Sequence, residues 1–229
     1  MDILLIAGLW LDESVWNDVA NELTALGHRP HPLALPGQGD GSTTATLEDQ
    51  QAAMLKAIDS MPEKPVVVGH SAACTLAWLA ADARPEKTAG VALIGGFPAA
   101  DGDSYADFFE PVDGLMAFPG WEPFEGPDSA DLDEQARRRI QSAAVAVPEG
   151  VSRGKVRLTD DRRFGVPVVL ICPEFSPAEA RQWIASGDVP ELAKAEKLSY
   201  VDIDSGHWPM ISKPVELARL LTTAAAGLA

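Results

Sequence analysis

Cysteine and long hydrophobic runs are both scarce in this chain of 229 residues. The two cysteines, Cys74 and Cys172, fit no metal-binding spacing. They could pair, but the amino-terminal stretch MDILLIAGLW shows neither a basic segment nor a cleavage site of the export type. No apolar run approaches the roughly 20 residues that a membrane-spanning helix needs. We therefore expect two free, buried thiols in a cytoplasmic protein that uses no metal or other cofactor.

Positive charge is also in short supply. The chain has 18 lysines and arginines against 34 aspartates and glutamates, which gives a formal net charge of −16. This balance argues against a nucleic-acid partner, because such proteins carry basic stripes, and against binding to an anionic membrane surface. We expect a solvated acidic surface and a small-molecule partner.

The hydrophobic content of 46% is enough for one domain with a sizeable core. Short apolar segments alternate with helical patterns along most of the chain, which predicts an α/β fold with a mostly parallel sheet and helices on both faces. The predicted strands are Asp2–Ala7, Arg29–Leu35, Val66–Val68, Gly90–Ile94, Val166–Ile171 and Tyr200–Ile203. The predicted helices are Asp12–Leu26, Leu47–Met61, Ala72–Ala83, Ser176–Ala185 and Pro214–Ala226.

Regular alternation is lost at about residues 97–163. Prolines and aromatic residues crowd Glu110–Pro127, and a helix-like stretch, Ala130–Val145, follows them. Long irregular segments in a compact domain are usually lids or binding loops, and the aromatic content argues against disorder. We interpret this region as a cap insertion over the sheet, within a single domain that spans residues 1–229.

A serine stands at the junction of the third predicted strand and the helix behind it, in Pro65–Cys74 (PVVVGHSAAC). A sharp strand-to-helix turn exposes the hydroxyl of such a serine and places backbone donors behind it. Gly69 lies two residues before Ser71, while Ala73 stands where the G-x-S-x-G pattern has its second glycine. Alanine is the smallest replacement, so we expect the turn to survive. The alternative is an ordinary turn with a serine helix cap.

A histidine, His207, follows the last predicted strand. The carboxyl ends of parallel strands gather at one edge of a sheet, so groups that follow the strands come together. A serine, a carboxylate and a histidine occur in that order along the chain, as one catalytic-triad architecture requires. This order predicts Ser71 as the nucleophile and His207 as its general base.

The carboxylate that orients His207 is less sharply specified. Glu174, directly after the fifth strand, is the favoured residue. Asp101 and Asp103, after the fourth strand, are the alternatives, whereas Asp204 is too close in sequence to His207 to reach its ring easily.

An oxyanion needs two backbone N–H groups. We expect these from Ala72, which follows the nucleophile, and from Leu9, in the turn after the first strand. Trp10 would then form a wall of the substrate pocket. The alternative is that Trp10 only packs in the hydrophobic core.

Three more residues, His70, Phe97 and Trp208, are candidates for the same pocket. For His70 we expect a side chain that points away from Ser71.

Three segments carry a resemblance to a known family: Gly8-Leu9-Trp10, Gly69–Ala73 and Gly206-His207-Trp208. The chain resembles the α/β-hydrolase superfamily, in the small single-domain branch that includes plant hydroxynitrile lyases, esterases and many bacterial hydrolases. The resemblance implies an eight-stranded sheet whose first two strands are missing here, which leaves about six. It also implies an aspartate where this chain has Glu174.

These features predict a serine esterase, a hydrolase that cleaves a carboxylic ester or lactone through an acyl-enzyme on Ser71. The aromatic insertion favours a small to medium, mainly apolar substrate. One alternative is acid/base catalysis of the hydroxynitrile-lyase type, although no lysine follows a strand end near Ser71. The other is a non-catalytic ligand-binding protein. The family resemblance implies a monomer or a homodimer.

Overall fold

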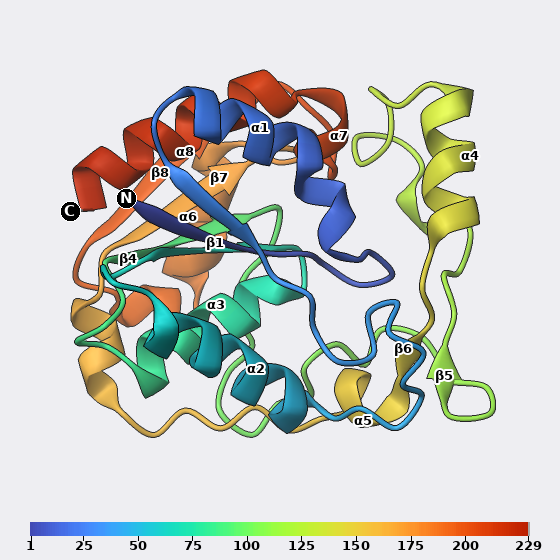
Figure 1. Ribbon diagram of the computed structural model, residues 1–229, viewed down its shortest axis with the longest axis horizontal. Coiled ribbons are helices and arrows are strands. Elements are labelled where there is room, and N and C mark those ends of the chain that lie inside the picture. The colour runs from blue at the N-terminus through green and yellow to red at the C-terminus, as the bar shows by residue number, and fades with distance from the viewer. Residues whose placement is uncertain (229) are drawn as a thin grey trace.

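The computed structural model describes residues 1–228 and contains a six-stranded sheet in the order β2-β1-β3-β4-β7-β8 (Figure 1). All neighbouring strands in it are parallel. The strands are β1 (Asp2–Ile6), β2 (Arg29–Pro32), β3 (Val66–His70), β4 (Gly90–Ile94), β7 (Val168–Cys172) and β8 (Leu198–Asp202). The predicted α/β-hydrolase fold, with six strands and helices on both faces, is confirmed.

Helices cover both faces of the sheet. In Figure 1, α1 and α8 lie above it and α2 and α3 lie below it. The side chains of α6 pack into the same core as those of α2 and α3. The long helices outside the insertion are α1 (Asn17–Ala25), α2 (Leu47–Ser60), α3 (Ala73–Ala83), α6 (Pro177–Ser186) and α8 (Pro214–Leu228). The short elements are η1 (Glu13–Trp16), η4 (Leu192–Lys194) and α7 (Pro209–Ser212).

The central strands are buried along their whole length, because helices cover both of their faces. Along β1, Ile3 and Leu5 enter the core under α1 and α8, while Leu4 and Ile6 enter the core on the α3 side. This alternation explains why the sequence shows continuous apolar runs at these strands.

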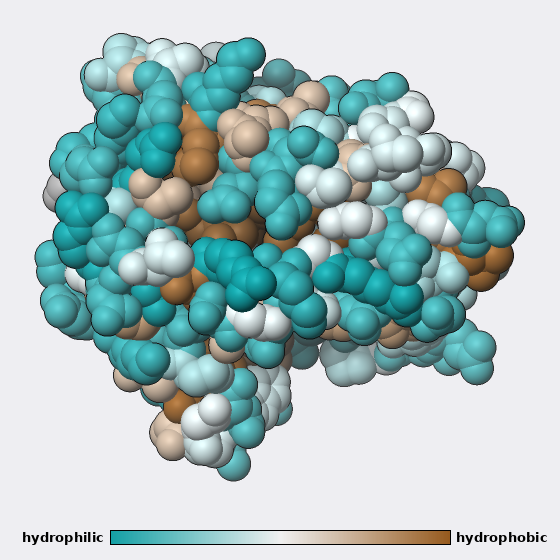
Figure 2. Space-filling view, turned by 90° about the horizontal axis from the view of Figure 1, so that it is seen from below, coloured by the Kyte–Doolittle hydropathy of each residue, from teal (hydrophilic) through white to brown (hydrophobic). Residues whose placement is uncertain are grey.

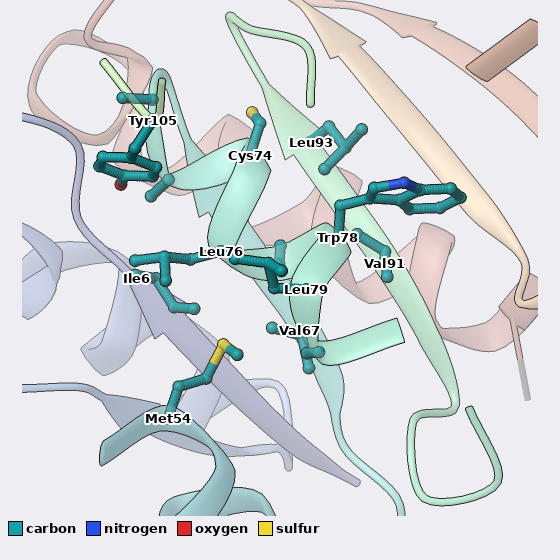
Figure 3. Packing of buried hydrophobic residues seen from close by; sticks show 14 of the residues in the cluster. Ile6, Met54, Val67, Cys74, Leu76, Trp78, Leu79, Val91, Leu93 and Tyr105 are labelled. Carbon is teal, nitrogen blue, oxygen red and sulfur yellow. The ribbon is translucent and has the colours of Figure 1, made fainter. Parts of the chain in front are cut away.

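Helix α3 is buried over ten of its eleven residues. Figure 3 shows Leu76, Trp78 and Leu79 of this helix packed beside Val67 of β3 and Val91 of β4. A helix that is apolar all round belongs in a core. Its amino-terminal end is therefore rigidly fixed directly after Ser71.

A buried ion network fastens the end of the insertion to α3. Arg163 contacts Asp82 at 3.3 Å through Nη1 and Glu191 at 2.9 Å through Nε. The indole N–H of Trp78 donates to the same Glu191 carboxylate at 3.0 Å. These side chains are at most 6% exposed, so each charge depends on its partners for compensation.

Strand β2 forms one edge of the sheet and ends at Pro32, three residues earlier than predicted. The N–H groups of Arg29 and Leu33 donate to carbonyls on the β1 side, at 2.9 and 3.0 Å. The backbone groups of successive residues in a strand point alternately to its two neighbours. The backbone nitrogens of Pro30 and Pro32 therefore point away from β1, towards the free side of this edge.

The buried carboxylate of Asp2, on β1, accepts hydrogen bonds from Arg29 at 2.8 and 2.9 Å and contacts His31 Nε2 at 2.9 Å. The guanidinium of Arg29 is the main cause that lowers the pKa of Asp2 well below its usual range, and His31 adds to it. Together these contacts fasten β2 to β1.

The insertion between β4 and β7 contains more regular structure than its sequence indicates. It holds an antiparallel pair, β5 (Leu115–Met116) with β6 (Val147–Pro148), and the helices η2 (Glu122–Phe124), α4 (Glu134–Ala143), α5 (Glu149–Ser152) and η3 (Asp161–Gly165). Figure 1 shows α4 and the β5–β6 pair beyond one end of the sheet, the end towards which β1 runs.

Some predicted boundaries were wrong by a few residues. The stretch predicted as one helix, Asp12–Leu26, begins as η1, because the Asp12 side chain accepts the N–H of Ser14 and caps a tighter turn. Within the helix-like stretch Ala130–Val145, only α4 (Glu134–Ala143) is helical. The helix begins there because the Asp133 side chain accepts the N–H of Ala136 and caps its first turn.

Both cysteines are buried and unpaired. Within residues 1–228, no helix combines the length and apolarity needed to cross a membrane. Hydrophilic residues dominate the face seen in Figure 2, and hydrophobic residues form only scattered groups on it.

Candidate active site

Ser71 lies in a strained, tightly packed turn. Its φ of +56° falls in the left-handed region, and its N–H donates to Ile94 O at 2.8 Å. A Cβ on Gly69 would lie 2.2 Å from Ala73 O, and a Cβ on Gly96 would lie 2.6 Å from Ser71 O. The turn therefore needs glycine at both positions, whereas it accommodates the methyl group of Ala73, which is buried. The expectation that this turn survives is confirmed.

His207 is held through its backbone on both sides. Its N–H donates to Asp128 O at 2.7 Å, and its carbonyl accepts a hydrogen bond from His70 Nε2 at 2.7 Å. A Cβ on Gly206 would lie 2.3 Å from Asp128 O, so only glycine allows this close approach. The imidazole is thus positioned jointly by the insertion and by the end of β3.

Glu174 is the carboxylate beside His207. Its Oε1 lies 2.7 Å from His207 Nδ1, and each side chain is 14% exposed. This short contact fixes the imidazole orientation and leaves Nε2 as the free ring nitrogen. A Cβ on Gly95 would lie 3.2 Å from Glu174 Oε2 and 3.3 Å from His207 Nδ1, so a glycine after β4 leaves room for the pair.

The two alternative carboxylates have other partners. Asp101 accepts the N–H of Leu158 at 2.9 Å, and Asp103 accepts the N–H of Ala100 at 3.3 Å. Both contacts stabilise the insertion. Of Glu174, Asp101, Asp103 and Asp204, only Glu174 hydrogen-bonds to the His207 ring.

His70 is buried, and its ring centroid lies 4.9 Å from that of His207. Burial is the main cause that lowers the pKa of His70, to about 3, and nearby positive charge on His207 acts in the same direction. The neutral ring donates from Nε2 to a carbonyl, so Nδ1 carries no proton. The ring lines the same cavity as Ser71, while its donor is committed to the His207 loop.

Two candidate oxyanion donors are the backbone N–H of Ala72, the residue after Ser71, and that of Leu9, which lines the aromatic cavity together with Ser71. Ala72 precedes α3, where the first N–H groups of a helix lack internal partners, and Leu9 lies in the turn after β1. Both residues lie outside the helices and strands, and within residues 1–228 neither N–H donates a hydrogen bond to a backbone carbonyl. Trp10, with φ of +62°, turns the chain sharply next to Leu9.

Ser71 lies between two cavities. The first, the aromatic cavity, has a volume of about 240 Å³ and is lined by Leu9, Trp10, His70, Ser71, Phe108, Phe109, Pro123, Phe124, Asp128, His207 and Trp208. The second, the wide cavity, has a volume of about 650 Å³. Its walls include Ser71, Ala72, Thr75, Phe97, Tyr105, Phe108 and Lys155.

The residues predicted for the pocket are therefore divided. Trp10, His70 and Trp208 line the aromatic cavity, whereas Phe97 lines the wide one and stacks on Phe175 at 5.4 Å between ring centroids.

Two features of this site were not predicted from the sequence. One is the glycine pair Gly95-Gly96, whose signal is its position directly after a predicted strand. The other is Asp128, which lies in an irregular stretch of the insertion where no sequence pattern distinguishes it from neighbouring acids.

The model of the alpha/beta hydrolase family matches residues 3–220. The chain belongs to this family. "Lipase LipV" from Mycobacterium tuberculosis (strain ATCC 25618 / H37Rv) is 28% identical to this alpha/beta hydrolase, over 96% of the chain and 91% of the lipase. The name of this relative supports hydrolase chemistry for the chain in broad terms.

Solved structures with the same fold include an extracellular alpha/beta-hydrolase from a Paenibacillus species, described as sharing structural and functional homology with tobacco salicylic acid binding protein 2. It has a TM-score of 0.80 and 17% identity, with 98% of each chain covered. A methylesterase from Arabidopsis has a TM-score of 0.77 and 14% identity, with 99% of each chain covered.

Proposed function

We propose that this alpha/beta hydrolase is a serine esterase. Its substrate is a carboxylic ester or lactone of small to medium size and mainly apolar character. One observation carries the proposal: His207, joined to Glu174 at 2.7 Å, lines the same cavity as Ser71, which lies in a strained turn. The names of the lipase and methylesterase relatives support ester hydrolysis.

In the first half-reaction His207 Nε2 accepts the proton of Ser71 Oγ as the oxygen attacks the carbonyl carbon. Glu174 stabilises the imidazolium that forms. The N–H groups of Leu9 and Ala72 receive the oxyanion, because Ala72 follows Ser71, Leu9 lines the same cavity, and neither N–H has a competing protein acceptor. His207 then protonates the leaving alcohol, and an acyl-enzyme remains on Ser71.

In the second half-reaction His207 takes a proton from water, which attacks the acyl-enzyme. The acid leaves and Ser71 regains its proton. No metal or other cofactor takes part in these steps.

The test is covalent labelling. The folded protein is treated with a serine-reactive fluorophosphonate, and the adduct is located by mass spectrometry. We expect one adduct, on Ser71, and turnover of short-chain p-nitrophenyl esters. Ser71→Ala should abolish both, whereas the matched control Ser60→Ala, at an exposed position on α2, should retain both. Absence of an adduct on Ser71 in folded protein overturns the proposal.

A second candidate is acid/base chemistry of the hydroxynitrile-lyase type. It is favoured by Lys155, which lines the wide cavity together with Ser71 and whose Nζ donates to Ser104 Oγ at 3.1 Å. Lys155 lies on the side of Ser71 that lacks His207, so we rank this function below ester hydrolysis. Labelled protein that cleaves a cyanohydrin and no ester would favour the lyase. Labelled protein without turnover of either would favour a ligand-binding role.

We further propose a cytoplasmic location, supported by the two unpaired cysteines, and a monomer or homodimer that binds neither nucleic acid nor membranes. Cell fractionation and light scattering after gel filtration test these points.

A further inference from the structure

Asp128 places an acidic residue in the wall of the aromatic cavity. It lies between η2 and α4, is half-buried, and lines this cavity together with Ser71 and His207. Its backbone carbonyl accepts the His207 N–H, but within residues 1–228 its carboxylate has neither a hydrogen bond nor an ion pair. Burial is the main cause that raises the pKa of Asp128, while positive charge on His207 acts in the opposite direction. The protein thus places an acidic residue at the cavity wall with no lysine or arginine beside it.

The other walls of the cavity are mainly aromatic and carry no lysine or arginine. The ring of Trp10 lies 5.9 Å from that of Phe124, which in turn lies 5.4 Å from that of Trp208. Aromatic faces carry negative partial charge and attract cations, most strongly where water is excluded. An unpaired carboxylate among aromatic rings suits an ammonium group better than a neutral or an anionic one.

The position of His207 decides which part of an ester enters this cavity. The leaving alcohol takes its proton from His207, so its oxygen must come within hydrogen-bond reach of that ring. His207 lines the aromatic cavity and is absent from the walls of the wide cavity. The alcohol part therefore occupies the aromatic cavity, and the acyl part extends into the wide one.

We propose that the aromatic cavity selects esters whose alcohol part carries an ammonium group, with Asp128 as the specificity-determining residue. This inference rests on the proposed function and names its substrate class. In the reaction the bond from Ser71 Oγ to the acyl carbon forms and the acyl–alkoxide bond breaks. The proton of Ser71 reaches the alkoxide through His207, which releases a cationic amino alcohol. Water then hydrolyses the acyl-enzyme and restores the serine proton.

Two esters of nearly the same shape test this. One is 2-(trimethylammonio)ethyl butanoate, and the other is 3,3-dimethylbutyl butanoate, in which carbon replaces the charged nitrogen. Hydrolysis of each is followed in a pH-stat at constant ionic strength. We expect kcat/KM to be about 3- to 30-fold higher for the cationic ester. Asp128→Asn should bring the ratio of the two values close to one. Glu125→Gln, which removes a charge from an exposed position of the insertion, should preserve the ratio.

The ratio is the readout, because a general loss of activity or of folded protein does not change it. As a second measurement on the unaltered enzyme, tetramethylammonium chloride should inhibit hydrolysis of the neutral ester competitively, while sodium chloride at equal concentration should not.

The outcomes separate the two proposals. Equal rates for the two esters, or a preference that Asp128→Asn retains, overturn this inference while Ser71 labelling leaves ester hydrolysis standing. Absence of labelling together with absence of turnover overturns both.

Discussion

Replacing Glu174 by glutamine tests the role of this acid, because the side chain keeps its shape and loses its charge. Glu174 Oε1 lies 2.7 Å from His207 Nδ1, within the range of a charge-assisted hydrogen bond. If Glu174 orients and stabilises His207, Glu174→Gln should lower kcat. KM should change little, because Glu174 lines neither the aromatic cavity nor the wide cavity.

The size of the effect follows from what the pair loses. Exchanging a charged acceptor for a neutral one costs about 1–2 kcal/mol. Two unit charges about 4 Å apart interact by about 4 kcal/mol at an effective dielectric constant of about 20, which sets the upper value for a pair that is mostly shielded from water. Since about 1.4 kcal/mol corresponds to a tenfold change in rate, we expect kcat to fall about 10- to 1,000-fold.

The assay is steady-state hydrolysis of a p-nitrophenyl ester, with the melting temperature of each variant measured beside it. Asp103→Asn removes the same charge from a residue that hydrogen-bonds to Ala100 N, and it should change kcat less than about threefold. The reasoning is refuted if Glu174→Gln retains kcat within about threefold of the original enzyme, or if Asp103→Asn loses as much.

Three further changes probe the supports of the site and of the fold. Gly206→Ala places a methyl group 2.3 Å from Asp128 O and should displace His207, lowering kcat about 10- to 100-fold in the same assay. Arg163→Met leaves two buried carboxylates without their partner and should lower the free energy of unfolding in urea by about 3–5 kcal/mol. Arg29 lowers the pKa of Asp2 in the folded state below its unfolded value of about 3.9, so the stability that this contact contributes is complete above that pH and lost as the pH falls below it. Urea titrations at about pH 3 and pH 6 should show a smaller loss of stability on acidification for Asp2→Asn than for the original protein.

Each of these changes has a control or a contrary outcome. Gly227→Ala in α8 meets no atom within 4 Å and should leave kcat unchanged, so an equal loss there would contradict the argument for Gly206. Arg162→Met breaks an exposed ion pair and should cost less than about 1 kcal/mol; a cost equal to that of Arg163→Met would contradict the role of burial. For Asp2→Asn, a loss of stability on acidification as large as that of the original protein would contradict the assignment of this pH dependence to Asp2.

The layout of the fold could be predicted because its main signals are local. The buried runs at β1, β3 and β7 are continuous and apolar, and the serine turn follows one of them directly. The insertion gave no such signal. Strands β5 and β6 have two residues each, too few for alternation, and α4 buries only Ala136 and Ile140.

The site could be predicted only in part, because sequence does not reveal which strands are neighbours. Glu174 follows β7, which pairs directly with β8, and His207 follows β8. Asp101 and Asp103 follow β4, and their backbone partners in the insertion could not be anticipated. The same holds for Asp128, whose place depends on a long-range backbone contact with His207.

The two prolines of β2 have a consequence for self-association. Pro30 and Pro32 face outward from the sheet and have no N–H group, so the free side of β2 offers acceptors without donors over this stretch. A strand arriving there from another molecule would form only part of a ladder, which protects this edge against sheet extension and aggregation. Any pairing of two copies into a continuous sheet must therefore use the opposite edge, β8, whose residues Leu198–Asp202 include no proline.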